Sequence, residues 1–308
     1  MMQVIRPDDL EQLNHCETAV ALGTFDGLHK GHQRILQLLE KHAGNLTKVV
    51  YTFENLPANA FLQKKRPALF TAEEKIRAFS AYPVDFLLLQ EFTKEYAAMD
   101  AADFIDYLLE KIHSRAIVVG FNYTFGKDGR GTADFLKEYA EAKGCSVFIS
   151  SPVTDGATTI SSSRIRELLL QGEIQSANAL LGYPYTMISK VVSGKQLGRT
   201  YGFPTANFAL RGYKLVPKNG VYISRVWYQH QKYIAITNVG TRPTVDDSHQ
   251  KNVETHIIGF SEEIYGESLR IEFLDFIRPE RRFSGLDELK AQLAKDLKTA
   301  VKFGQDHL

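Results

Sequence analysis

The sequence predicts an α/β protein of two domains, and three features of the 308 residues support this expectation. In roughly the first 180 residues, strand-like and helix-like segments alternate, which favours a parallel sheet with helices on both faces. After about Tyr183, short β-rich segments separated by Gly, Pro, Asn and Asp indicate an antiparallel sheet or a small barrel. The chain is also long for a single compact core.

The elements of the first part follow from apolar runs bounded by turn and capping residues. Thr71 and Glu74 form a capping-box pattern, in which the Thr71 hydroxyl accepts from the Glu74 amide while the Glu74 side chain reaches back. This pattern predicts a helix that begins after Thr71. Strands are expected at 19–22, 48–53, 84–89, 116–119 and 147–150, and further helices at 33–43, 103–112 and 134–142.

The second part is expected to hold β-strands followed by one closing helix. A helix is predicted from Ser284, because apolar residues then recur at three- and four-residue spacing. The helical run 164–181 is expected to connect the two parts, which gives predicted domains of 1–183 and 184–308. The strands are expected at 185–192, 220–227, 232–238, 253–259 and 269–276.

Composition limits the possible functions. Lys and Arg number 37 against 36 Asp and Glu, so neither nucleic acid nor an anionic membrane is expected as a partner. The apolar runs are far shorter than the ~20 residues that span a bilayer, which argues against a transporter. Cys16 and Cys145 lie far apart without metal-ligand spacing, and the N-terminal residues do not resemble a signal peptide. A cytoplasmic protein without an obligate protein partner is therefore expected.

A Gly-rich segment with two histidines connects the predicted strand 19–22 to the first helix. Gly23, Gly27 and Gly31 would let the backbone approach a phosphate, whose charge the helix N-terminus also favours. His29 and His32 are three residues apart, so on one helical turn both rings point the same way and can donate to one phosphate. A lone His-x-x-His pair is more often part of a surface turn, but its position at the first strand-to-helix turn favours a phosphate site.

Two further segments could complete such a site. Ser162 and Ser163 precede an amphipathic helix, and taken alone they would be read as its N-cap. Beside the histidine segment, the same helix start predicts an anion site, with Arg166 and the hydroxyls holding the phosphates that leave as pyrophosphate. Asn122 and Phe125 follow the predicted strand 116–119, at the carboxyl edge where parallel sheets bind ligands.

These segments resemble the FAD synthetase branch of the nucleotidyltransferase superfamily. His29-Lys30-Gly31-His32 looks like its His-x-Gly-His signature, and Phe25-Asp26-Gly27 looks like the branch-specific part. The resemblance implies a Rossmann-like N-terminal domain that adenylylates FMN, with His29 and His32 as catalytic residues and Phe125 against the flavin. One departure is Glu54-Asn55-Leu56-Pro57, where the family usually has an Asp-Pro-His-Pro-like stretch. The implied nucleotide-binding residues are Gly23, Phe25, Asp26, Gly31, Asn122, Ser162, Ser163 and Arg166.

A second set of motifs lies in the β-rich part. The Thr205 hydroxyl and the Asn207 amide oxygen are hard-oxygen ligands suited to Mg²⁺ on ATP phosphates. Gly198 and Gly202 would belong to a flexible loop that covers these phosphates. No Walker A pattern occurs in the chain. Alone, this segment would be read as a plain turn, but residues 194–207 resemble the riboflavin kinase signature.

The riboflavin kinase resemblance implies further roles and a barrel with a terminal helix. Glu254 occupies the place of a carboxylate beside the riboflavin 5′-hydroxyl, where it could accept the hydroxyl proton during attack on the γ-phosphorus. Read without this context, Glu254 would be an exposed acid on a strand. Arg278 and Phe283 are implied in flavin binding, and His256 is interpreted as structural.

Together the motifs resemble the bacterial bifunctional riboflavin kinase/FAD synthetase family over most of the chain. This implies that 184–308 makes FMN and ADP from riboflavin and ATP, and that 1–183 makes FAD and pyrophosphate from FMN and ATP, with Mg²⁺ in each site. Two alternatives remain open. One is a nucleotidyltransferase for another acceptor, which Thr205, Asn207 and Glu254 argue against. The other is a flavin-sensing protein with one decayed site, which only the departure at 54–57 favours.

Overall fold

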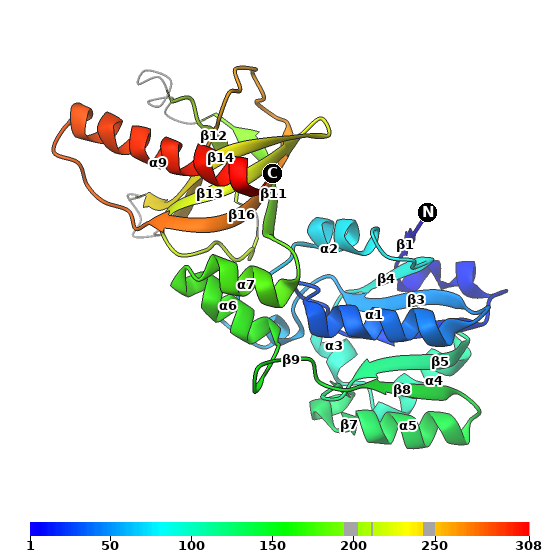
Figure 1. Ribbon diagram of the computed structural model, residues 1–308. Helices are drawn as coiled ribbons and strands as arrows, with labels where there is room; N and C mark the ends of the chain where they lie inside the picture. The colour runs from blue at the N-terminus through cyan, green and yellow to red at the C-terminus, as the bar shows by residue number, and fades with distance from the viewer. Residues whose placement is uncertain (194–202, 211, 243–249, 308) are drawn as a thin grey trace. The chain divides into compact units, whose positions relative to one another are not determined.

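The computed structural model describes residues 1–193, 203–210, 212–242 and 250–307 (Figure 1). The chain divides into two compact units, Met1–Ser162 and Ser163–Leu308, which are called the N-terminal unit and the C-terminal unit below. Within the described ranges, no helix has both the length and the apolar character needed to cross a membrane.

The N-terminal unit is built on a six-stranded sheet in which every neighbouring pair is parallel, as predicted. The short strand β1 was not expected, because its three residues carry no clear pattern and pair with β4 alone. The strands in spatial order are β1 (Gln3–Ile5), β4 (Phe86–Gln90), β3 (Thr47–Phe53), β2 (Thr18–Leu22), β5 (Ser114–Gly120) and β8 (Ser146–Ser150).

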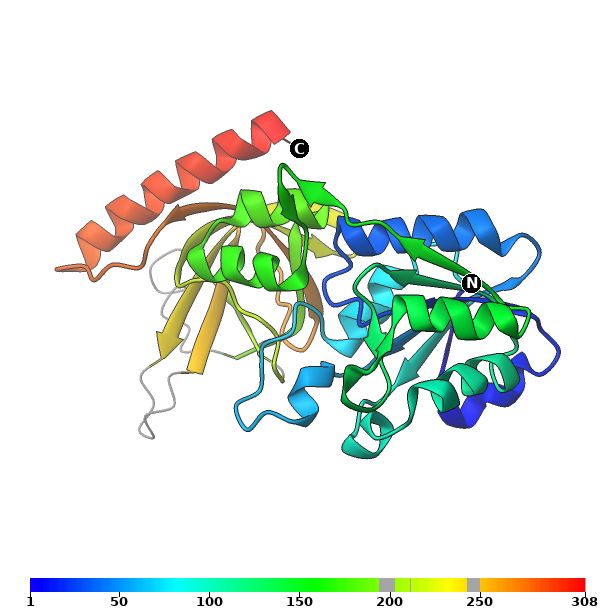
Figure 2. The same cartoon turned by 90° about the horizontal axis from the view of Figure 1, so that it is seen from below.

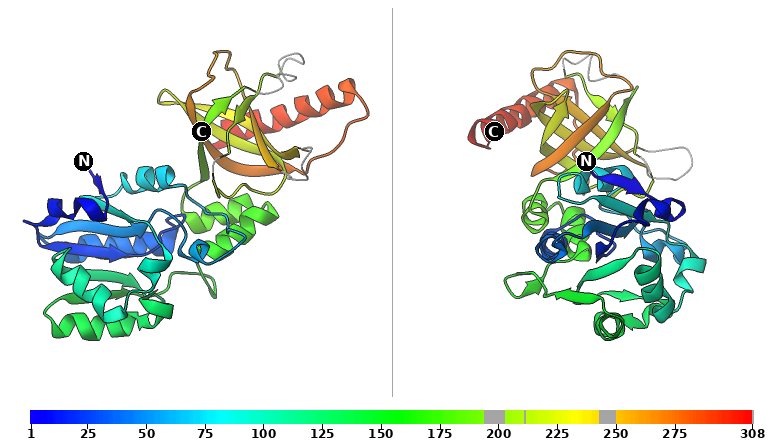
Figure 3. Two further views of the ribbon diagram at one scale, coloured as in Figure 1. Left: turned by 180° about the vertical axis from the view of Figure 1, so that it is seen from behind. Right: turned by 90° about the vertical axis from the view of Figure 1, so that its right-hand side faces the viewer.

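Helices cover this sheet (Figures 2 and 3). Residues of α4 and α5 share one core with alternate side chains of β2, β3 and β5, whereas α1 contacts β2, β3, β5 and β8. The capping box predicted at Thr71 is confirmed, because Thr71 Oγ1 accepts from the Glu74 amide at 3.2 Å and Glu74 Oε2 accepts from the Thr71 amide at 2.8 Å. The helices are α1 (Lys30–Ala43), α2 (Ala72–Phe79), α3 (Lys94–Ala97), α4 (Ala101–Glu110) and α5 (Ala133–Ala142).

The strand order explains where a ligand can bind in this unit. Strands β2 and β5 are neighbours in the sheet. The connection that leaves β2 leads outward to β3, whereas the connection that leaves β5 leads in the other direction, to β8. Ligands of such sheets bind beyond the carboxyl ends of the strands at this switch point. The turn that carries His29 follows β2, and the loop that carries Asn122 follows β5. Short hairpins, β6–β7 (Thr124–Phe125, Gly131–Thr132) and β9–β10 (Thr154–Asp155, Thr158–Thr159), lie nearby in the sequence.

The C-terminal unit is a closed six-stranded barrel in which all neighbours are antiparallel, so the β-rich pattern resolves into a barrel. Strand β12 was read as part of a turn, because Pro204 and its neighbours lack a strand pattern. The barrel order is β11 (Tyr185–Val192), β12 (Ala206–Phe208), β15 (Gln250–Ile257), β14 (Gln231–Arg242), β13 (Gly220–Tyr228) and β16 (Ser268–Arg278).

The predicted closing helix is α9 (Leu286–His307), drawn in red in Figure 1, and it packs on the outside of the barrel. Ala300 of α9 is fully buried against Val221, Ile223 and Ile236, with Leu297 and Phe303 at the edge of this cluster. The apolar face of the helix therefore packs against one side of the barrel wall.

The prediction of one continuous helical run over 164–181 is wrong. The structure has two helices there, α6 (Ser162–Gln171) and α7 (Ile174–Leu181). Gly172 separates them with a φ of +84°, a conformation that glycine adopts without strain. The Asn178 side chain then joins α7 to the barrel, donating to Phe273 O at 2.8 Å and accepting from the Tyr185 amide at 2.7 Å. Both helices belong to the C-terminal unit apart from Ser162.

Candidate active sites

The turn between β2 and α1 brings the two predicted histidines together. His29 precedes the first residue of α1 in an extended conformation, and its ring stacks on His32 with centroids 3.7 Å apart and planes inclined by 19°. This confirms that the rings point the same way. Gly31 leaves room for the His29 ring, because a Cβ there would lie 3.0 Å from Cε1 of His29.

Phe25 and Asp26 support this turn from inside the fold. The Phe25 ring is fully buried and contacts His32 edge-on at 5.3 Å. The Asp26 carboxylate accepts hydrogen bonds from the amides of Leu69 and Phe70, both at 3.0 Å. Both side chains thus hold the turn in shape. Their predicted contribution to nucleotide binding would act through the position of His32 and of the turn backbone.

His32 is electrically neutral at neutral pH. Burial lowers its pKa well below the usual 6.5, and the nearby His29 and the positive charge of Lys75 lower it further. Its Nδ1 atom is buried and has no hydrogen-bond partner in the part of the chain that is described. A neutral imidazole carries one N–H, so His32 can donate one hydrogen bond to a phosphate oxygen.

A pocket of about 190 Å³ gathers three of the sequence motifs at the carboxyl edge of the sheet. The Ser162 hydroxyl donates to Asp26 O at 2.8 Å and so ties the first residue of α6 to the histidine turn. Ser163 and Arg166 lie further along α6 in the C-terminal unit, and their phosphate contacts stay predictions. The polar side chains lining the pocket include His29, His32, Asn122, Ser161 and Ser162.

A larger pocket of about 780 Å³ adjoins the first, and Gly23 lies in its wall. The two pockets share His32, Ile35, Gly120 and Asn122. Rings surround the larger pocket, which suits a flat aromatic ligand. Of these rings, only Phe125 could be predicted from the sequence, because the rings come from segments far apart in the chain. The seven aromatic lining residues are Phe53, Phe61, Phe92, Tyr96, Phe104, Tyr123 and Phe125.

The departure at 54–57 builds part of the wall of this larger pocket. The Asn55 side chain donates to Phe92 O at 3.0 Å and accepts from the Phe92 amide at 2.9 Å. Glu54 forms an ion pair with Arg6 at 2.8 Å. Pro57 and Phe92 both line the pocket. The segment therefore fixes a ring that faces the pocket, although it lacks the family's usual histidine.

In the C-terminal unit, β15 runs beside the segment that enters β12. Asn207 and Glu254 are register partners, and Asn252 Nδ2 donates to Glu254 Oε1 at 2.7 Å. His256 Nδ1 lies 2.8 Å from Pro204 O and anchors the segment before β12. This contact supports the structural interpretation of His256. The predicted base and one predicted metal ligand are thus brought together on neighbouring strands.

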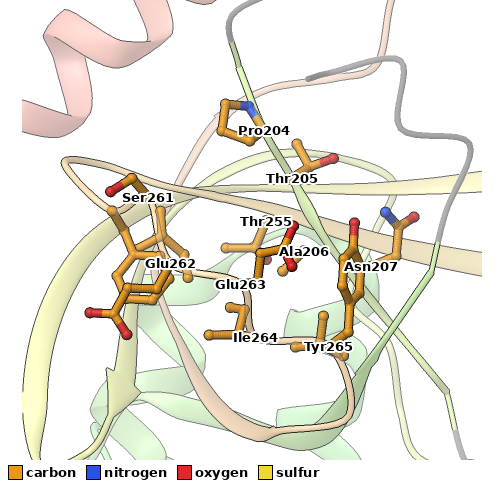
Figure 4. A pocket seen from close by; sticks show the side chains of 13 residues that line it. Pro204, Thr205, Ala206, Asn207, Thr255, Ser261, Glu262, Glu263, Ile264 and Tyr265 are labelled. Carbon is orange, nitrogen blue, oxygen red and sulfur yellow. The ribbon is translucent and has the colours of Figure 1, made fainter. Parts of the chain in front are cut away.

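Thr205 and Asn207 also line a pocket of about 320 Å³, opposite residues 261–265 of the loop after β15 (Figure 4). Their hydroxyl and amide oxygens fit Mg²⁺ bound to ATP phosphates. Glu254 is not among the lining residues. Of β15, Thr255 and Ile257 line the pocket, while Glu254 lies across the strand pair from Asn207. Gly198 and Gly202 fall outside the described residues.

Arg278, predicted to bind flavin, joins the end of β16 to α9. Its Nε and Nη2 atoms donate to Asp296 Oδ2 at 3.0 and 2.8 Å, and only 1% of the Asp296 side chain is exposed. The Arg278 guanidinium also lies 5.8 Å from the centre of the Phe283 ring. The structure therefore pairs the two predicted flavin residues with each other, and their contact with a flavin stays a prediction.

Comparison with known proteins matches each unit to a family model, described as FAD synthetase over residues 11–164 and as riboflavin kinase over residues 181–303. The bifunctional riboflavin kinase/FMN adenylyltransferase of Listeria monocytogenes is 34% identical over 94% of this chain and 93% of its own length. That of Escherichia coli strain K12 is 35% identical over 98% of both chains. A solved structure titled "macrolide-efflux protein" from Streptococcus pneumoniae is 34% identical, with a TM-score of 0.88 over 96% of this chain and 98% of that one. The chain belongs to the bifunctional riboflavin kinase/FMN adenylyltransferase family.

Proposed function

We propose that the chain phosphorylates riboflavin to FMN in its C-terminal unit and adenylylates FMN to FAD in its N-terminal unit. ATP is the donor in both steps, with ADP leaving in the first and pyrophosphate in the second. The two family models, which match separate segments of the chain, support one activity in each unit. We place the functional boundary near Tyr183, close to the start of the riboflavin kinase match at residue 181.

The assignment of adenylyl transfer to the N-terminal unit is supported best by the wall that its two pockets share. The aromatic pocket suits the isoalloxazine ring of FMN, and the smaller pocket at the histidine turn suits ATP phosphates. His32 and Asn122 line both pockets, so the FMN phosphate and the α-phosphorus of ATP would meet beside them.

In this step an oxygen of the FMN phosphate attacks the α-phosphorus, and the bond from that phosphorus to the oxygen bridging to the β-phosphorus breaks. Negative charge grows on the α-phosphate oxygens during the attack. His29 and His32 would donate hydrogen bonds to these oxygens, and donors of this kind stabilise a transition state more than bound ATP. Ser162, Ser163 and Arg166, at the start of α6, would hold the pyrophosphate that leaves.

In the kinase half, the riboflavin 5′-hydroxyl attacks the γ-phosphorus of ATP. Glu254 would accept the hydroxyl proton as the new P–O bond forms and the bond to the ADP oxygen breaks. Thr205 and Asn207 would hold Mg²⁺, which neutralises phosphate charge when it is bound. The pairing of Asn207 with Glu254 supports this arrangement, because the two residues lie opposite each other on adjacent strands.

The expected partners are small molecules only: riboflavin, FMN, FAD and ATP. Cys16 and Cys145 are both free thiols, which suits a reducing compartment. We therefore infer a cytoplasmic enzyme that works without nucleic acid, a membrane or an obligate protein partner.

Incubation of the pure protein with riboflavin and Mg-ATP, followed by chromatography, tests this function. FMN should appear first, and FAD should follow at its expense. A nucleotidyltransferase for another acceptor would give no riboflavin-dependent ADP. A flavin sensor would bind riboflavin and leave it unchanged. Either result would overturn the proposal.

A further inference from the structure

Lys75, on α2, is buried inside the N-terminal unit, with 3% of its surface exposed. Burying an ammonium group is costly unless oxygen atoms replace the lost water. Three oxygens do so here: Nζ donates to Thr24 O at 2.9 Å, to Thr52 Oγ1 at 3.3 Å and to Phe53 O. Neither the sequence motifs nor the mechanism above uses this residue.

These three acceptors join two segments of the adenylyl-transfer site. Thr24 belongs to the turn that leads to His29, whereas Thr52 and Phe53 end β3. The Thr52 hydroxyl donates its proton to Thr24 O at 3.0 Å. In its contact with Lys75, Thr52 Oγ1 can therefore only be the acceptor. All three partners are therefore acceptors. A neutral amine has two N–H groups and an ammonium has three, so the geometry requires the charged form.

The charges around Lys75 come from several elements. Burial lowers the pKa of Lys75 from 10.5 to about 8, and the Asp26 and Glu54 carboxylates partly offset this effect. Asp26 is held by the amides of residues 69 and 70, and Glu54 by Arg6. His32 lies close enough to Lys75 for the ammonium charge to lower the pKa of His32. The neighbouring His29 also lowers the pKa of His32.

We propose that Lys75 is a positioning residue for adenylyl transfer. Its ammonium fastens the histidine turn to the end of β3 and places a fixed positive charge behind that turn. This charge adds to the effect of burial and of His29 that keeps His32 neutral as a hydrogen-bond donor, and it adds to the field that attracts the ATP phosphates. The proposal rests on the adenylyl-transfer function proposed above for this unit.

The test compares Lys75→Met with Arg77→Met. The first removes the ammonium and keeps an unbranched side chain, while the second removes a positive charge from an exposed position on the same helix. With FMN and Mg-ATP as substrates, K75M should lower the turnover of FAD formation roughly 10- to 100-fold and leave the KM for FMN within about twofold. R77M should match the wild type in both.

Two readouts separate positioning from a merely structural role. In the wild type, FAD formation should fall as the pH rises through about 8, where Lys75 loses its proton, and K75M should lack this fall. The His32 pKa, followed by NMR of the imidazole, should be higher in K75M than in R77M, because a positive neighbour has been removed.

A folded K75M protein with the FAD rate and the His32 pKa of R77M would overturn the proposal. If K75M does not fold, the wild-type pH profile decides, and an FAD rate that stays level from pH 7 to about 9.5 would overturn it. A wild type that makes no FAD at all would instead contradict the proposed function of the unit.

Discussion

Asn207 on β12 and Glu254 on β15 lie directly opposite each other across an antiparallel strand pair. Side chains at such paired positions share one face of a sheet, with Cβ atoms about 5 Å apart. In the proposed mechanism, Asn207 would hold the Mg²⁺ on the ATP phosphates, and Glu254 would accept the proton of the hydroxyl that attacks them.

The first prediction concerns Glu254→Gln, which keeps the size of the side chain and removes its ability to accept a proton. FMN formation should fall by roughly 100-fold or more, because general base catalysis typically contributes this much. FAD formation from added FMN should not change. The exposed Glu267, changed to Gln, provides the control. Kinase activity of E254Q within a few-fold of E267Q would remove Glu254 from the mechanism.

The second prediction concerns the stacked histidines. His29→Ala or His32→Ala should each lower the turnover of FAD formation by about 100- to 1,000-fold, the usual cost of losing one donor to a developing oxyanion. FMN should then accumulate from riboflavin. His15→Ala, at an exposed position in the same unit, is the control. If the double mutant keeps the circular dichroism of the wild type and still makes FAD at its rate, the histidine site is wrong.

The third prediction concerns the buried ion pair between Arg278 and Asp296, whose side chains are 16% and 1% exposed. Asp296→Ala leaves the guanidinium without its carboxylate partner, so the free energy of unfolding should fall by about 3 kcal/mol. Trp227, the single tryptophan, reports unfolding of the C-terminal unit by fluorescence in urea. Asp287 is exposed on the same helix, and Asp287→Ala should lower the free energy of unfolding far less. Equal effects of the two variants would show that the pair contributes nothing specific.

The fourth prediction concerns stability and pH. Because the pKa of Lys75 is about 8 in the folded state and near 10.5 when unfolded, the unfolded chain binds the additional proton between these values. The free energy of unfolding of the wild type, relative to K75M, should therefore rise by about 3 kcal/mol from pH 8 to 10.5. Circular dichroism in urea measures this free energy. The transition of the C-terminal unit, which Trp227 fluorescence reports, is subtracted so that the unfolding of the N-terminal unit remains. A difference that falls with pH would contradict the assignment.

Local patterns in the sequence predicted the parts of the molecule that depend on near neighbours. The spacing of His29 and His32 predicted a shared ring direction, and the structure shows the rings stacked. Thr71 and Glu74 predicted the start of α2 correctly. In both cases the interacting residues lie within one helical turn, so their geometry follows from local backbone structure.

Features that depend on tertiary packing could not be predicted. Strand β12 forms because Ala206 and Asn207 pair with β15, some fifty residues away, and nothing local favours a strand there. The aromatic wall of the larger pocket combines rings from segments between Phe53 and Phe125. No local pattern in the sequence indicates that Lys75 is buried, since its acceptors come from two other segments that only the fold brings close.

The most direct test of two transfers by one chain is to follow the phosphorus atoms. Wild-type protein is incubated with riboflavin and Mg-ATP labelled at either the γ- or the α-phosphorus, and the flavins are separated by chromatography. The γ-label should enter FMN and then FAD, whereas the α-label should enter FAD alone. Unlabelled flavins with both forms of ATP, or α-label in FMN, would contradict the assignment of a kinase and an adenylyltransferase to this chain.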